Sequence, residues 1–260
     1  MQYKAKKRFG QNFLKDKSYL YQIIQSIPKI YDQDQIVEIG VGLGDLSDEL
    51  LKLYPLKAYE IDSDLCSLLR EKYKQPLETG RLELINQDVM KIDRSEGWLH
   101  SETYILVSNL PYYVATPIIL KAMRDPLCKG FVVMTQKEVA QKFCAKSGMS
   151  DFCALSVLSE SLGSIDYLFD VPASAFEPAP KVTSAVFRIK KDSMFISPDF
   201  EKFLKIAFCS PRKKLFKNLV SHYDKDQLQG IFIQCQINEN ARSHELSTSA
   251  YHQIFNHLKG

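Results

Sequence analysis

The sequence predicts a doubly wound α/β domain followed by a small helical domain. Between about residues 36 and 144, short apolar runs alternate with helical patterns. Repeated strand–helix units form a mostly parallel sheet with helices on both faces. Two later strands, near 166–171 and at 184–189, follow one another without a helix, which predicts an antiparallel edge strand. From Pro198 onward the pattern is helical, so we place a domain boundary near residue 195.

The first five strands are short runs that are apolar or alternate between apolar and polar residues. We expect them at residues 36–39, 57–61, 81–86, 104–107 and 130–134. The intervening helical patterns carry apolar residues three or four positions apart. We expect helices at 45–53, around Leu65, Leu68 and Leu69, at 117–123 and at 136–144.

Composition restricts the class of protein. The chain has 260 residues, of which 45% are apolar, and none of its apolar runs approaches the ~18 residues of a membrane span. The basic start lacks the apolar stretch of a secretory signal, so we expect a cytoplasmic protein. The six cysteines contain no C-x-x-C pair and the five histidines are isolated, so we expect reduced thiols and no metal site.

Charge is distributed unevenly along the chain. An arm at 1–17 carries a net +5, residues 18–180 carry −8, and residues 181–260 carry +6. Basic ends around an acidic middle favour a polyanion as partner, although a solvated basic tail is the alternative for the arm. We divide the chain into the arm, a central domain at 18–195 and a helical domain at 196–260. The candidate contacts to the polyanion are Lys4, Lys6, Lys7, Arg8, Lys181, Arg212, Lys213, Lys214 and Lys217.

A glycine loop follows the first strand of the predicted sheet. Gly40, Gly42 and Gly44 join this strand to a helix, where the backbone can approach a ligand closely. Glu60 stands 20 residues after Gly40, at the end of the next strand, where a carboxylate accepts both ribose hydroxyls of a nucleoside. The G-x-G-x-G spacing is not the dinucleotide fingerprint, so S-adenosylmethionine fits better than NAD.

Asp88 follows the third strand. This position would let its carboxylate meet the adenine amino group of the same nucleoside. The alternative is that Asp88 caps a helix N-terminus.

The segment Ser108-Asn109-Leu110-Pro111-Tyr112 directly follows the fourth strand, at the sheet edge where open α/β folds bind ligands. The lone pair of an adenine amine is delocalised into the ring. The Asn109 oxygen and the Leu110 carbonyl can accept both amine hydrogens and direct the lone pair at a methyl donor. Pro111 would stiffen the turn and Tyr112 would stack on the unstacked base. A Pro-terminated turn without function is the alternative.

From Arg8 to about Leu219 the chain resembles the KsgA-type rRNA adenine dimethyltransferases. The glycine loop and the Asn109–Tyr112 segment match the cofactor and catalytic motifs of that family. The other matching segments are Arg8–Leu14, Gln136–Val139 and Phe176–Ser184, the last being similar to F-x-P-x-P-K-V-x-S.

The resemblance implies a Rossmann-like class I methyltransferase fold and a role for several residues. Asn12 and Leu14 would contact the methionine end of S-adenosylmethionine, and Gly40 would form the floor of its site. Glu60 would bind the ribose, Asp88 the adenine, and Asn109 would lie at the reaction centre. Phe176 would cover the target base opposite Tyr112, with core packing as its alternative role.

The resemblance also implies an activity. Such enzymes convert two adjacent adenines in the 3′-terminal hairpin loop of small-subunit rRNA to N6,N6-dimethyladenine, and they use four cofactor molecules per rRNA. The basic arm and helical domain would hold the immature small subunit through phosphates and RNA shape. We expect a monomer, because the ribosome supplies the large interface.

The chain departs from the family pattern at three positions. Val41 stands where Pro is usual, a change that should leave cofactor binding intact. Tyr113 replaces the usual Asn and Ala115 the usual Ser or Thr, and both could alter the extent of methylation.

Three alternatives stay open. An Erm-type large-subunit rRNA methyltransferase shares the cofactor and catalytic motifs. The protein could instead act chiefly as a ribosome-assembly factor, and the Asn109→Ala change would separate binding from chemistry. A methyltransferase for small molecules or DNA is the third alternative, which the basic helical domain does not support.

Overall fold

The computed structural model describes residues 3, 6, 10–29, 34–93, 97–192 and 196–259. The chain forms two compact units, of which the first comprises 1–140 with 165–194 and the second comprises 141–164 with 195–260. The chain passes from the first unit to the second for the last time between residues 194 and 195. Residues 141–164 differ from the expectation, because they join the second unit although they precede the end of the sheet.

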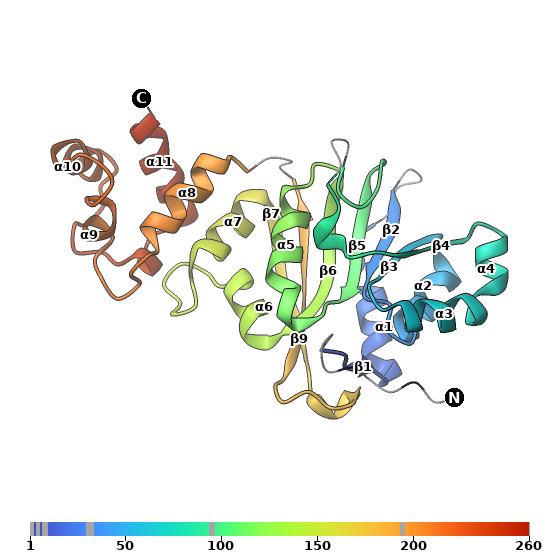
Figure 1. The fold of residues 1–260 in the computed structure, drawn as a ribbon. Helices are drawn as coiled ribbons and strands as arrows, with labels where there is room; N and C mark the ends of the chain where they lie inside the picture. Colours follow the sequence, from blue (N-terminus) through green and yellow to red (C-terminus); the bar gives the residue numbers. More distant parts are fainter. Residues whose placement is uncertain are drawn as a thin grey trace. The chain divides into compact units, whose positions relative to one another are not determined.

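The first unit contains a seven-stranded sheet with the order β4-β3-β2-β5-β6-β9-β7 (Figure 1). From β4 to β6 the strands are parallel, and β9 pairs antiparallel with β6. The predicted antiparallel strand is therefore β9. It does not form the edge of the sheet, because β7 lies beyond it. The strands are β2 (Gln35–Ile39), β3 (Leu56–Glu60), β4 (Leu82–Asn86), β5 (Tyr104–Asn109), β6 (Cys128–Gln136), β7 (Gly163–Val171) and β9 (Ser184–Lys191).

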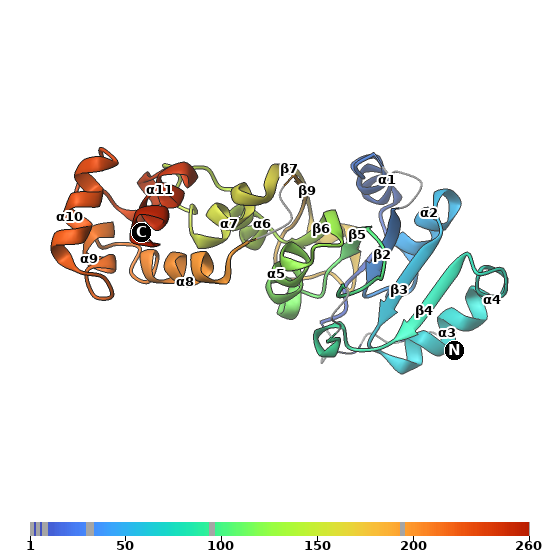
Figure 2. The same ribbon diagram turned by 90° about the horizontal axis from the view of Figure 1, so that it is seen from above.

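Helices cover both faces of this sheet. In Figure 2, α1 and α2 lie on one side of the strands and α5 lies on the other. Helix α1 begins after Asp16, whose side chain accepts a hydrogen bond from the Ser18 amide and so satisfies one free N–H of the first turn. The helices are α1 (Lys17–Gln25), α2 (Asp45–Leu53), α3 (Ser63–Lys72), α4 (Lys74–Glu78), α5 (Ala115–Arg124) and α6 (Lys137–Cys144).

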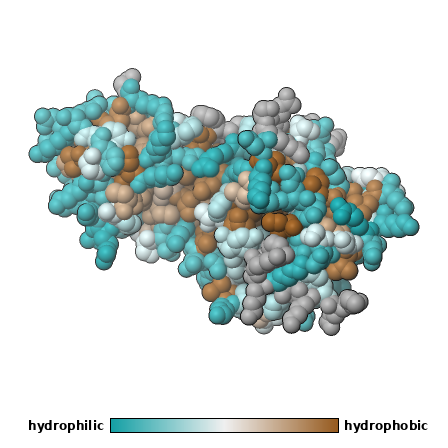
Figure 3. All heavy atoms as spheres, in the orientation of Figure 1, coloured by the Kyte–Doolittle hydropathy of each residue, from teal (hydrophilic) through white to brown (hydrophobic). Residues whose placement is uncertain are grey.

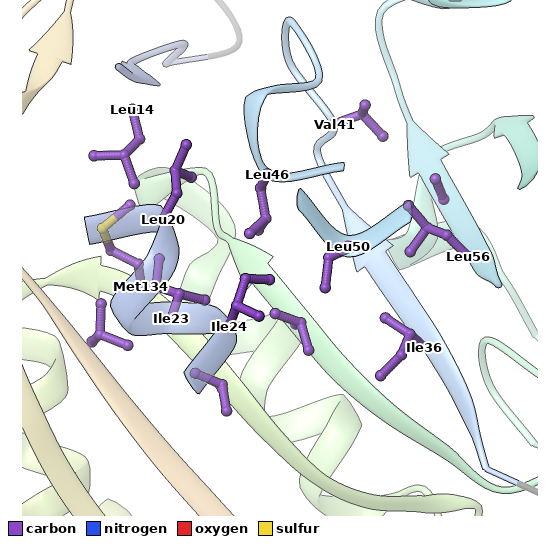
Figure 4. Packing of buried hydrophobic residues seen from close by; sticks show 14 of the residues in the cluster. Leu14, Leu20, Ile23, Ile24, Ile36, Val41, Leu46, Leu50, Leu56 and Met134 are labelled. Carbon is purple, nitrogen blue, oxygen red and sulfur yellow. The ribbon is translucent and has the colours of Figure 1, made fainter. Parts of the chain in front are cut away.

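A hydrophobic core forms between the sheet and helices α1, α2 and α3. Figure 4 shows Leu20 and Ile23 of α1 and Leu50 of α2 beside side chains from the strands, among them Ile36. Leu50 is fully buried. Burying an aliphatic side chain of this size contributes about 1.5–3 kcal/mol relative to its exposure to water. This core fixes the strand ends that carry the glycine loop.

A second, two-stranded sheet joins the N-terminal arm to the segment before β9. Strand β1 (Phe13–Leu14) pairs antiparallel with β8 (Phe176–Glu177). The Lys15 amide extends this contact by donating to the Ala175 carbonyl at 2.8 Å. The sequence analysis did not predict this sheet, because two-residue strands leave no periodic pattern.

The second unit is helical, as predicted. Its helices are joined by packed aromatic rings. The ring centroids lie 5.2–6.3 Å apart in the pairs Phe200–Phe255, Phe203–Phe255 and Phe203–Tyr251. Its helices are α7 (Ala154–Leu162), α8 (Pro198–Ala207), α9 (Leu215–Leu219), α10 (Lys225–Gln234) and α11 (Thr248–Lys259).

The surface of the molecule is mostly hydrophilic on the face drawn in Figure 3, and hydrophobic residues form separate patches there. Among the described residues, each helix is too short or too polar to cross a membrane.

Candidate functional site

A cavity in the first unit brings most of the predicted site residues together. The chain passes from β2 to β3 and β4 on one side and to β5 and β6 on the other, so the strand order reverses between β2 and β5. Open α/β sheets bind ligands at the carboxyl ends of strands beside such a reversal. The predicted residues that line the cavity are Asn12, Leu14, Gly40, Gly42, Glu60, Asp88, Asn109, Leu110, Pro111 and Tyr112.

Gly42 shows why the loop after β2 requires glycine. Its φ is +61°, in the left-handed region that L side chains rarely adopt. A Cβ at this position would lie 2.9 Å from the nearest ring carbon of Phe13 in the arm. The loop and the arm can therefore meet beside the cavity only because residue 42 has no side chain.

Glu60 is held at the end of β3 by backbone hydrogen bonds. Its Oε2 accepts from the Gly42 amide at 3.0 Å and its Oε1 accepts from the Asp62 amide at 2.9 Å. Burial raises the pKa of Glu60, and these hydrogen bonds oppose that shift. A carboxylate oxygen has two acceptor sites, so both oxygens keep the capacity to bind hydroxyl donors in the cavity.

Glu38 is a second carboxyl group in the cavity wall, and the sequence analysis assigned it no role. It is only 1% exposed, and the Ser47 hydroxyl donates to its Oε2 at 2.5 Å. Burial raises the pKa of Glu38 to about 8. Its position two residues before Gly40, at the end of a buried strand, was the signal that could have identified it.

Asp88 caps a helical turn and also lines the cavity. Its Oδ1 accepts from the Met90 amide at 3.0 Å, so it caps the short 3₁₀ turn Val89–Lys91. The same residue lines the cavity. The cap therefore orients a carboxylate that belongs to the cavity wall.

Contacts on both sides hold the segment after β5. The Asn109 Nδ2 donates to the carbonyl of Asn12 at 3.2 Å. The Leu110 amide donates to the Met134 carbonyl at 3.0 Å, which ties the segment to β6. With its amide nitrogen bound to the arm, Asn109 keeps its side-chain oxygen as an acceptor.

The two tyrosines after Pro111 differ in their surroundings. Tyr112 is half-buried, and its hydroxyl is hydrogen-bonded to the Ser184 hydroxyl at the start of β9. Tyr113 also lines the cavity, but 61% of it is exposed. Burial and the nearby acids Asp88 and Glu60 raise the pKa of Tyr113. A large exposed aromatic ring therefore borders the cavity.

Phe176 does not line the cavity. It is 5% exposed and lies in the apolar core with Leu14, its partner in the β1–β8 sheet. Phe176 therefore packs in the apolar core, and its role toward a base stays a prediction. Its position in the motif could not reveal the two-stranded sheet that buries it.

The basic residues predicted to contact RNA fall into three groups. Lys4, Lys7 and Arg8 lie outside the described residues. Lys6 contacts Asp62 and Asp64 at 2.6 Å each, so the structure pairs it within the protein rather than leaving it to a polyanion. The exposed ones are Lys181 in the first unit and Arg212, Lys213, Lys214 and Lys217 in the second, where Lys214 also bonds to Asn240.

The charge of the cavity indicates the kind of ligand that fits it. Among the described residues that line it, four are acidic and none is Lys, Arg or His. A phosphate group would find no cationic partner in this wall, whereas Glu60 and Asp88 would attract a cationic nucleoside; Glu38 has a pKa of about 8 and Asp45 is paired with Lys15, so these two add little charge. The acidic lining residues are Glu38, Asp45, Glu60 and Asp88.

Comparison with known proteins gives a family match over almost the whole chain. The family described as "Ribosomal RNA adenine dimethylase" matches residues 2–260. A protein of Helicobacter hepaticus named "Ribosomal RNA small subunit methyltransferase A" is 54% identical, over 99% of this chain and 93% of its own length. A protein of Campylobacter hominis with the same name is 51% identical, over 99% of this chain and 97% of its own length.

Two solved structures share the fold. A dimethyladenosine transferase from Plasmodium falciparum is 25% identical, with a TM-score of 0.78 over 93% of this chain and 95% of that one. The 23S rRNA methyltransferase ErmE is 21% identical, with a TM-score of 0.73 over 96% of this chain and 100% of that one. At this identity, the second likeness concerns the fold alone.

Proposed function

Because this chain belongs to the ribosomal RNA adenine dimethylase family, we propose that it transfers methyl groups from S-adenosylmethionine to small-subunit rRNA. The acceptors are the N6 amines of two adjacent adenines in the 3′-terminal hairpin loop. The observation that carries the proposal is the orientation of Asn109, whose nitrogen is bound to Asn12 while its oxygen remains available beside an acidic cavity.

The residues that line the cavity fit S-adenosylmethionine. Glu60 accepts the ribose hydroxyls, and Asp88 accepts the adenine amine at the end of the cavity that it lines. Asn12 and Leu14 of the arm line the same cavity and would border the methionine end. The cofactor carries a sulfonium and an ammonium against a single carboxylate, so the acidic wall favours it over a nucleotide.

The chemistry requires positioning of the acceptor amine rather than a strong base. When bound, S-adenosylmethionine supplies an electrophilic methyl group on a sulfonium sulfur. The Asn109 oxygen and the Leu110 carbonyl accept the two N6 hydrogens and direct the nitrogen lone pair at that methyl group. The cofactor would give up this methyl group and keep the C–S electron pair on sulfur, and the amine held by Asn109 and Leu110 would release one proton to solvent.

Two aromatic residues are available to the flipped base. Tyr112 is fixed by its bond to Ser184 and offers a ring face inside the cavity, where an unstacked adenine gains stacking energy. Tyr113 offers a further exposed ring at the same cavity. A second methyl transfer to the same nitrogen requires the monomethylated base to remain stacked in this position.

The RNA is held mainly through its phosphates. The exposed basic residues of the second unit, with Lys181 of the first, provide charges that neutralise the backbone. The substrate is the immature small subunit in the cytoplasm, and methylation accompanies its biogenesis.

The test is a methyl-transfer assay with labelled S-adenosylmethionine and purified protein. Unmethylated small subunits and large-subunit rRNA are supplied separately, and the rRNA nucleosides are identified by mass spectrometry. Dimethyladenosine in small-subunit rRNA alone is expected. Label in large-subunit rRNA alone would contradict the proposed substrate, and no transfer to either RNA would contradict the proposed reaction.

A further inference from the structure

The carboxylate of Asp62 gathers three side chains from the N-terminal arm. Its Oδ2 accepts from the Tyr3 hydroxyl at 2.5 Å and from the Gln11 amide at 3.2 Å, and its Oδ1 lies 2.6 Å from the Lys6 ammonium. The Asp62 side chain is fully buried in this arrangement. Charge-assisted hydrogen bonds of this kind are about twice as strong as neutral ones.

The ionisation of this cluster is consistent with its geometry. Burial alone would raise the pKa of Asp62, but the hydrogen bonds from Lys6 and Tyr3 outweigh it and lower the pKa to about 2. Burial and the bond to Asp62 raise the pKa of Tyr3 to about 12. At neutral pH the carboxylate is therefore ionised and the phenol keeps its proton.

The backbone of Asp62 also contacts the cofactor cavity. Its amide donates to Oε1 of Glu60, the carboxylate that we assign to the ribose. Asp62 therefore holds the arm with its side chain and the ribose carboxylate with its main chain. The two contacts lie on one residue at the turn between β3 and α3.

The arm in turn forms one wall of the cavity. Gly10, Gln11, Asn12, Phe13 and Leu14 all line it. Within this stretch, the Asn12 carbonyl accepts from Asn109 at the reaction centre. An arm released from Asp62 would lose a fixed position at both the cofactor and the catalytic asparagine.

We propose that Asp62 is the anchor that holds residues 10–14 of the arm against the cofactor cavity, so that this placement and cofactor binding stabilise one another. This inference rests on the proposed function, because it takes S-adenosylmethionine as the ligand. Coupling between two binding events is reciprocal, so a cofactor that contacts the arm in this placement also favours the placement. Asp62 is thus a positioning residue that acts through the arm and Glu60.

The test compares the full-length protein with its Asp62→Asn variant, because asparagine caps α3 as well as aspartate does but lacks the charge. Isothermal titration with S-adenosylmethionine gives the Kd, and hydrogen exchange gives the protection of arm amides. Loss of a hydrogen bond to a charged group predicts a Kd about tenfold or more higher. Arm protection should fall in the free variant and return when cofactor saturates it.

Two further variants separate anchoring from folding. Tyr3→Phe combined with Lys6→Met removes two of the three arm partners of Asp62 and keeps the ring of residue 3 that packs against the core, and changes in the same direction are expected. Asp64→Asn removes the exposed second partner of Lys6, and its Kd should change less than twofold.

The outcomes distinguish this inference from the proposed function. An unchanged Kd with a loosened arm would overturn the coupling, and a raised Kd with an unchanged arm would overturn the anchor. Both results would leave the methyltransferase assignment standing. Failure of the unmodified protein to bind S-adenosylmethionine would overturn the cofactor assignment and this inference with it.

Discussion

At the scale of single residues, Asn109 is the side chain on which the proposed chemistry depends. Its nitrogen is bound to the Asn12 carbonyl, and the Leu110 amide beside it is bound to β6. These contacts fix the direction of the Asn109 oxygen before the base arrives. Such preorganised polar groups act without reorganisation at the moment of reaction.

The Asn109→Ala variant should lose about 10²–10³-fold in kcat, the cost of removing one preorganised hydrogen-bonding group. Its Kd for S-adenosylmethionine should change much less, because Glu60 and Asp88 remain. Single-turnover methyl transfer and titration measure the two quantities. The Asn109→Asp variant retains an acceptor and should keep part of the activity, and equal loss in both variants would contradict the role of the oxygen.

Tyr113 should affect the extent of methylation, because its ring is exposed at the cavity and could stack on a base. In Tyr113→Asn, the ratio of monomethyl- to dimethyladenosine should rise, whereas Tyr113→Phe should behave like the unmodified protein. Mass spectrometry of nucleosides at limiting enzyme measures this ratio. A larger change in Tyr113→Phe than in Tyr113→Asn would show that the hydroxyl acts rather than the ring.

Glu38 should make the stability of the free protein depend on pH. Burial raises its pKa from an ordinary value of 4.5 to about 8, so the folded state holds the proton more tightly than the unfolded state does. The free energy of unfolding should therefore fall as the pH rises from about 5 to 8. Glu38→Gln should lack this part of the slope in urea unfolding, and parallel slopes in both proteins would contradict the shift.

The sequence predicted the cavity-lining residues that belong to contiguous motifs, because strand ends and glycine spacing fix their positions. Gly40, Glu60 and Asn109 all line the cavity as expected. The sequence did not reveal the surroundings of Phe176 and Lys6, because these depend on contacts with residues far away in the chain. The β1–β8 pairing buries Phe176, and Asp62 pairs with Lys6 from 56 residues away.

At the scale of secondary-structure elements, the arm and the glycine loop depend on one another. Gly42 has a positive φ and no space for a Cβ beside Phe13. The arm reaches the same place through the β1–β8 sheet. Neither element forms this cavity wall alone.

Gly42→Ala should therefore weaken cofactor binding as well as stability. A left-handed alanine costs about 1–2 kcal/mol, and the added methyl group must displace the Phe13 ring. The matched control is Gly80→Ala, which has a similar φ of +71° but nothing within 4 Å of the added Cβ. Both variants should lose stability in thermal unfolding, Gly42→Ala the more because of its contact with Phe13, and only Gly42→Ala should bind S-adenosylmethionine less tightly. An unaltered Kd would contradict the contact.

The sequence predicted the order of strands and helices well because their periodicity is local. Helix α2 spans Asp45–Leu53, the same residues that the pattern indicates. The pattern gave no sign that 141–164 join the second unit, because amphipathicity shows which face of a helix is buried but not which partner buries it. The contacts of α7 with α8 and α11 decide this assignment.

At the scale of the whole molecule, the cofactor cavity and the proposed RNA-binding surface differ in the sign of their charged residues. The cavity of the first unit is lined by acids, which suits a cationic cofactor. The second unit carries the exposed residues Arg212, Lys213 and Lys217, for which the described residues show no ion pair. These residues suit the phosphates of RNA.

Replacing Arg212, Lys213 and Lys217 together by Gln should weaken RNA binding and flatten its dependence on salt. Each lost phosphate contact reduces the slope of log K against log salt by about 0.7–0.9, so three contacts reduce it by about 2.1–2.7. Filter binding of small-subunit rRNA over a range of salt concentrations measures the slope. Lys225→Gln, at an exposed lysine of α10, is the control, and an equal slope in the triple variant would exclude these residues from the interface.

The central claim is dimethylation of two neighbouring adenines, and the most direct measurement of it is the number and position of methyl groups on the RNA. Unmethylated small subunits are incubated to completion with the protein and S-adenosylmethionine, and the 3′-terminal hairpin fragment is sequenced by mass spectrometry. The predicted result is four methyl groups, two on each of two adjacent adenines. Methyl groups at other bases, or none in this hairpin, would contradict the account.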